Sequence, residues 1–235
     1  PAAAQSAPTA PAPPASPDAS SWVVLSWNDL GMHCYNRDFQ NLAVLPPFNT
    51  LWSQVIHVGD PPQIVTDTVS VTYSFPNNTY SVGKSNFWDY DLALFGVDLP
   101  PNIGLTGRGL AGNMDRAADH FIADGIPLTE FQDSAPTTAY PYQLATVIAG
   151  AADGTELART ITVAPVSTDM HCDYCHQDGG VEDIATGSVE TNILTLHDRE
   201  NAEDYPPGFG KLMDNRPVLC AACHASNALG APGQP

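Results

Sequence analysis

The chain has 235 residues, of which 26 are acidic and only 8 are basic, and its formal net charge at pH 7 is −18. This balance excludes a basic surface for nucleic acid or anionic lipid, and it favours cationic partners, bound metal ions or self-assembly. Hydrophobic residues make up 43% of the chain, enough for a core, and no apolar run approaches the length of a membrane span.

The first segment, residues 1–20, consists mainly of Pro, Ala and Ser. A segment of this composition has too few large apolar side chains to form a core, so it becomes ordered only when something else holds it. A neighbouring subunit is the candidate. We therefore predict that residues 1–20 are a Pro/Ala-rich N-terminal tail that contacts another subunit, the alternative being a disordered linker.

Residues 21–165 are predicted to form a mainly β domain, either a sheet or a small sandwich. Runs rich in β-branched and aromatic residues, which are typical of strands, occupy 22–27, 69–75, 142–149 and 156–163. Asp153-Gly154, between the last two runs, is a hairpin turn signal. We expect long loops over 96–135, with one short helix over 116–123.

Residues 166–235 contain four of the five cysteines and four of the seven histidines. We predict a loop-rich region with short helices here. Ser188 is a suitable N-cap for a helix that runs to about Arg199. In that helix Val189, Ile193 and His197 share one face.

Two pentapeptides in this region have the form C-x-x-C-H: Cys172-Asp-Tyr-Cys175-His176 and Cys220-Ala-Ala-Cys223-His224. This is the attachment sequence for c-type haem. Two thiols one helical turn apart reach the two vinyl groups of one porphyrin, and the following histidine binds the iron. The two motifs therefore predict two haem c groups, attached through the four cysteines, with His176 and His224 as iron ligands.

Two other uses of paired cysteines are possible. A Cys₄ zinc site usually has 15–20 residues between its pairs, whereas 44 residues separate Cys175 from Cys220. Two disulfides are compatible with an exported protein. Neither alternative explains why a histidine follows both pairs, so we favour haem.

The distal ligands must come from the remaining histidines, and their number favours bis-histidine ligation of both irons. His197, on the apolar face of the predicted helix, is the first candidate. His33, in a tight glycine-containing loop after a strand, is the second. His171 points away from the haem of the adjacent motif and could serve a haem of another subunit. The alternatives are a solvent-facing His197, a hydrogen-bonded core His33 and an ordinary surface role for His171.

Two features lie outside the haem motifs. Cys34 is the unpaired cysteine, and it is either a small buried apolar side chain or a reactive or intermolecular thiol. The carboxylate-rich segment Trp88-Asp-Tyr-Asp91 is expected to be a loop that binds calcium, the alternative being a solvated acidic surface.

Four stretches resemble a group of exported multihaem cytochromes from metal-respiring bacteria and their relatives: 27–34, 45–49, 192–198 and 217–226. The resemblance implies an extracellular electron carrier, and some such proteins polymerise into cytochrome filaments. It also implies that His33 and His197 match motif positions that could be haem ligands. The familiar filament cytochromes carry more than two haems per subunit.

The predicted function is that of a dihaem c-type cytochrome, an electron carrier and not an enzyme. We expect it to polymerise so that its haems form a continuous chain, and to meet other redox proteins or extracellular electron acceptors. Because c-type haem is attached outside the cytoplasm and the chain begins at Pro1, we read it as a mature secreted, extracellular product whose export signal has been removed. The alternatives are a monomeric periplasmic dihaem shuttle and a dihaem peroxidase-like enzyme.

Overall fold

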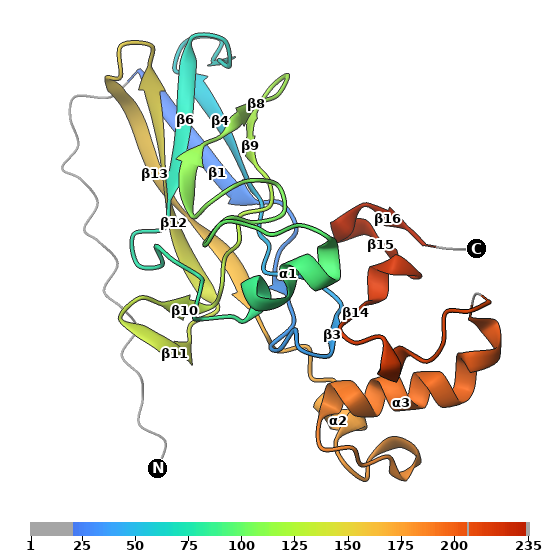
Figure 1. Cartoon of the computed structure of the whole chain (residues 1–235). Helices are drawn as coiled ribbons and strands as arrows, with labels where there is room; N and C mark the ends of the chain where they lie inside the picture. Colours follow the sequence, from blue (N-terminus) through green and yellow to red (C-terminus); the bar gives the residue numbers. More distant parts are fainter. Residues whose placement is uncertain (1–20, 206, 234–235) are drawn as a thin grey trace.

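The computed structural model describes residues 21–205 and 207–233 (Figure 1). The predicted subunit-contacting tail, residues 1–20, lies outside the described residues. Within them the chain is mostly β-strand with a few short helices, which confirms the predicted fold class. No described helix combines the length and the apolar character needed to cross a membrane.

Two five-stranded sheets build the N-terminal part of the chain. The first has the order β1-β4-β9-β8, with β5 paired to β4. Its strands are β1 (Trp22–Asn28), β4 (Leu51–His57), β5 (Gln63–Ile64), β8 (Asp115–Arg116) and β9 (Phe121–Ala123). The second has the order β2-β13-β12-β6-β7. Its strands are β2 (His33–Cys34), β6 (Val69–Ser74), β7 (Ala111–Asn113), β12 (Tyr142–Ala151) and β13 (Glu156–Ser167).

The two sheets enclose one core, so the domain is a sandwich. Along β12, buried side chains alternate with half-buried ones, as the period of a strand requires. Val147 from this strand belongs to the same buried cluster as Val71 of β6 and Leu51 of β4. Buried Met114 links β7 directly to β8, and so joins the two sheets at one edge.

The prediction of a helix over 116–123 is wrong, because this segment forms the antiparallel hairpin β8–β9. Phe121 and Ala123 point into the core while Ile122 is half-buried, a strand alternation stabilised by pairing with β4. The expected long loop over 96–135 likewise contains short strands, including β10 (Phe131–Gln132), which pairs with β11 (Ala135–Ala139).

The segment Trp88–Asp91, predicted to be a calcium-binding loop, is instead part of helix α1 (Phe87–Phe95). The buried Asp91 carboxylate accepts hydrogen bonds from the amides of Leu92 (2.6 Å) and Leu99 (2.9 Å). It therefore holds the segment after the helix against α1. Within the described residues, no group of three or more His, Cys, Asp or Glu side chains is arranged to hold a metal ion. Calcium stays a prediction without a located site.

Residues 168–233 form short elements beside the sandwich, drawn in orange to red in Figure 1. The helices are α2 (Asp173–His176) and α3 (Val189–Asn201), and the single 3₁₀ turns span 181–183, 202–204, 212–214, 220–222 and 227–229. The strands are β14 (Val218–Leu219) and the paired β15 (Ala225–Ser226) and β16 (Ala231–Pro232). Helix α3 begins as predicted: the Ser188 side chain accepts the amide of Thr191 at 3.2 Å.

This region is fixed to the N-terminal domain mainly at β3 (Leu42–Ala43). Strand β14 pairs in parallel with β3. Leu42 also joins Leu194 of α3 and Leu212 in a small second core. Strand β13 runs to Ser167, two residues past the predicted domain boundary, and leads within five residues to the first C-x-x-C-H motif.

Candidate functional site

The two C-x-x-C-H motifs, 172–176 and 220–224, fold into the same backbone turn. In each motif the amide of the histidine donates to the carbonyl of the first cysteine at 2.9 Å. The amide of the second cysteine donates to the same carbonyl, at 3.3 Å in the first motif and 3.2 Å in the second. Each motif therefore holds its two thiols and its histidine on one helical turn, although only the first is part of an α-helix.

All five cysteines lie in the described part of the chain and carry free thiols. Cys175 and Cys223 are exposed, whereas Cys172 and Cys220 are half-buried and line the same cavity of about 290 Å³. Burial raises the pKa of both half-buried thiols, and the proximity of Cys172 adds to the rise at Cys220. One cysteine of each turn thus lines the same cavity. Neither pair of cysteines forms a disulfide.

Helix α3 positions the first turn through Asn192. The side-chain amide of this buried residue donates to the carbonyl of His176 at 2.8 Å and to the Asp178 carboxylate at 2.9 Å. Its oxygen accepts the amide of Thr186 at 2.8 Å. The second turn is held differently, because β14 ends at the residue before it and pairs with β3 in a separate two-stranded sheet.

His197 of α3 lies beside the histidine of the second motif. Its ring centre is 6.0 Å from that of His224, and the two ring planes are inclined at 74°. Its Nδ1 is 2.8 Å from the hydroxyl oxygen of Tyr205, and within the described residues no hydrogen bond engages Nε2. With metal–imidazole bonds of about 2 Å, two imidazoles that bind one metal ion from opposite sides have ring centres about 6 Å apart. The spacing therefore suits a shared iron.

His33 is a buried histidine of β2. Its Nε2 lies 2.9 Å from the carbonyl oxygen of Pro46, and its ring packs on Phe48 with centres 5.7 Å apart. Burial lowers the pKa of His33, so the ring is neutral at neutral pH. This is the environment of a hydrogen-bonded core histidine, and the assignment of His33 as a distal ligand stays a prediction.

His171 lies at the edge of the first motif. Its ring stacks on Tyr174 with centres 4.4 Å apart, and its side chain is 47% exposed. Among the described residues, no second histidine ring packs against His176. The second motif therefore has a histidine beside its predicted iron ligand, whereas the first motif has none.

The other two histidines and the unpaired cysteine lie away from both motifs. His57 packs edge-on against Trp22, and His120 stacks on Trp52 with ring centres 4.2 Å apart. Cys34 is half-buried where β2 pairs with β13, and burial, together with nearby carboxylates, raises the pKa of its thiol.

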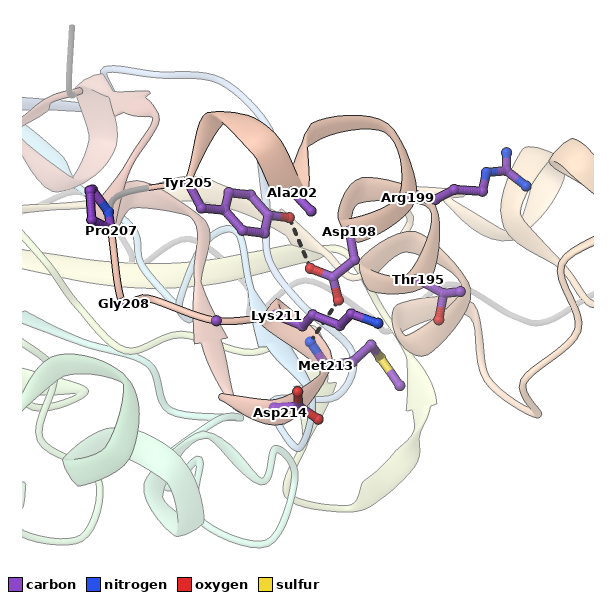
Figure 2. A pocket seen from close by; sticks show the side chains of 11 residues that line it. Thr195, Asp198, Arg199, Ala202, Tyr205, Pro207, Gly208, Lys211, Met213 and Asp214 are labelled. Atoms are coloured by element: carbon purple, nitrogen blue, oxygen red, sulfur yellow. Dashed lines mark hydrogen bonds between the residues drawn. The ribbon is translucent and has the colours of Figure 1, made fainter.

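A cavity of about 960 Å³ opens beside the C-terminal end of α3 (Figure 2). No residue of either C-x-x-C-H motif lines it. Among its lining residues, Asp198 accepts the Tyr205 hydroxyl at 2.9 Å and the amides of Leu212 and Met213 at 2.7 and 3.0 Å. The resemblance covers Asn192 and Asp198 without giving them a role, and no motif spacing marks Tyr205.

Comparison with protein-family models, with curated proteins and with solved structures found no match to this chain.

Proposed function

We propose that this chain is a dihaem c-type cytochrome that carries electrons outside the cytoplasm. The observation that supports it best is that both C-x-x-C-H sequences adopt one backbone turn, with two free thiols and a histidine in each. That is the arrangement that thioether attachment requires. Neither a zinc site nor a pair of disulfides requires a histidine directly after each cysteine pair.

The residues present fit two haem groups. The four motif cysteines would hold the porphyrins, and His176 and His224 would bind the irons. The 6.0 Å spacing between His197 and His224 favours His197 as the second ligand of one iron. Bound haem would supply one-electron transfer.

A closed iron favours an electron carrier over the peroxidase-like alternative. A dihaem peroxidase needs one iron with an open position and an acid–base group beside it. In this proposal the second iron is closed by His197, and the distal ligand of the first is His33 or a histidine of another subunit, with His171 the candidate. The half-buried thiols of both motifs line one cavity, which favours two haems close enough to act as a relay.

The direct test is the number of covalent haems. Intact mass after acid–acetone extraction is expected to exceed the polypeptide mass by two haems, because thioethers survive that treatment and non-covalent haem does not. A chain with the bare polypeptide mass, made in a host that attaches c-type haem, would contradict the proposal.

We also propose that the chain polymerises and that residues 1–20 contribute to the contact. A two-haem relay conducts over distance only if copies join end to end, through heterologous contacts that need not close. Deleting residues 1–20 is expected to weaken assembly, measured by sedimentation, and to leave the haem spectrum unchanged. If the full chain sediments as a monomer at every concentration, the monomeric shuttle replaces the filament.

A further inference from the structure

Three side chains form a hydrogen-bonded series that leads away from the second haem motif. His197 Nδ1 lies 2.8 Å from the Tyr205 hydroxyl, and that hydroxyl lies 2.9 Å from the Asp198 carboxylate. The tyrosine ring also stacks on the His197 ring, with centres 5.8 Å apart and planes inclined at 24°. Figure 2 shows the Asp198 carboxylate directed at the Tyr205 hydroxyl on one side and at the chain around Met213 on the other.

The direction of each hydrogen bond in this series follows from Asp198. Its two carboxylate oxygens accept the backbone amides of Leu212 and Met213 at 2.7 and 3.0 Å. The side chain is buried and acts as an acceptor, so the hydroxyl of Tyr205 donates to it. A hydroxyl has one hydrogen. The contact between Tyr205 and His197 therefore has the histidine as donor, with its proton on Nδ1.

We propose that Tyr205, oriented by Asp198, is the positioning residue that fixes His197 in the Nδ1–H tautomer and strengthens its Nε2 as an iron ligand. This inference rests on the proposed function. A ligand histidine with its second nitrogen hydrogen-bonded is fixed in tautomer and ring orientation, and it becomes more basic. Tyr205 is a good acceptor because its own proton is drawn toward a carboxylate.

The consequence for the haem is a lower reduction potential. A more basic axial histidine favours oxidised over reduced iron, and hydrogen bonding around the ligands is one of the means by which proteins set haem potentials. Only the haem bound by His197 should be affected. Tyr205 and Asp198 therefore give the two haems different reduction potentials. That difference would set the order in which electrons occupy the two haems.

The test is Tyr205→Phe in the full haem-loaded chain, which keeps the stacked ring and removes only the hydroxyl. We expect two haems to remain, both low-spin, while the potential of one rises. A tenfold change in the relative binding of oxidised and reduced iron corresponds to about 59 mV for one electron, and a shift of that order is expected. The matched control is Tyr35→Phe, which removes a hydroxyl that donates to Glu130 at 2.6 Å inside the sandwich. It should shift neither potential.

A second measurement needs no substitution. In the reduced, diamagnetic protein, NMR of the His197 ring should show an Nδ1–H protected from exchange with water. If Tyr205→Phe retains both haems with unchanged potentials, or if the Nδ1–H exchanges freely, the positioning role is refuted while the cytochrome assignment stands. If the unsubstituted chain carries no covalent haem, the proposed function itself fails. The two failures are therefore distinguishable.

Discussion

Replacing Cys220 and Cys223 together by alanine should remove one covalent haem and leave the other. Each motif holds its own thiol pair on a separate backbone turn, and the two turns are anchored by different elements, β14 for the second and Asn192 of α3 for the first. Loss of one pair should therefore not prevent attachment at the other. Intact mass would show a chain with one haem, with about half of the haem absorbance.

The reciprocal variant, with Cys172 and Cys175 replaced by alanine, should also retain one haem. Cys34→Ala is the matched control, because it removes a half-buried free thiol outside both motifs, and it should keep two haems. If either double variant still carries two haems, the assignment of that motif is wrong. If the Cys34 variant loses one, attachment is not confined to the C-x-x-C-H motifs.

The features that were predicted correctly are local in the sequence. The strand runs show their own alternation, and the cap at Ser188 lies three residues from the amide that it accepts. The motif turns are equally local, since each closes within five residues. Residues close in sequence determine these strands, caps and turns, so they can be predicted without knowledge of the rest of the fold.

The features that were missed depend on contacts that no periodic sequence pattern marks. Strand β9 forms a hairpin with β8, and its other edge pairs with β4, about seventy residues earlier; that second pairing places 121–123 in the sheet. The Asp91 carboxylate was predicted to bind a cation, but in the structure it accepts hydrogen bonds from two backbone amides. Tyr205 lies eight residues from His197, a spacing that no periodic pattern marks.

One stretch behind the resemblance, 192–198, shows why local motifs and distant contacts must be combined. Asn192 holds the turn of the first C-x-x-C-H motif, His197 lies beside the histidine of the second, and Asp198 accepts hydrogen bonds from Tyr205, Leu212 and Met213. A single helix thus contacts both motifs. The sequence marked the histidine alone, because only histidine carries a chemistry that can be recognised without its partners.

His197→Ala should convert one of the two haems from low-spin to high-spin and leave the other unchanged. In our proposal the Nε2 of this residue closes the iron bound by His224, and alanine offers no replacement. Optical and paramagnetic resonance spectra should show about half of the haem as high-spin, and added imidazole should restore the low-spin form by filling the open position.

The matched control for this substitution is His120→Ala, which removes a histidine stacked on Trp52 in the sandwich and should alter neither haem. His33→Ala is the informative companion: a change confined to the other haem would identify His33 as the ligand that the first motif lacks. If His33→Ala leaves the first haem unchanged, and if that haem binds added imidazole once the protein is diluted, its distal ligand comes from a neighbouring subunit. If His197→Ala leaves both spectra as they were, His197 is not a ligand, and the 6.0 Å approach of its ring to His224 is packing alone.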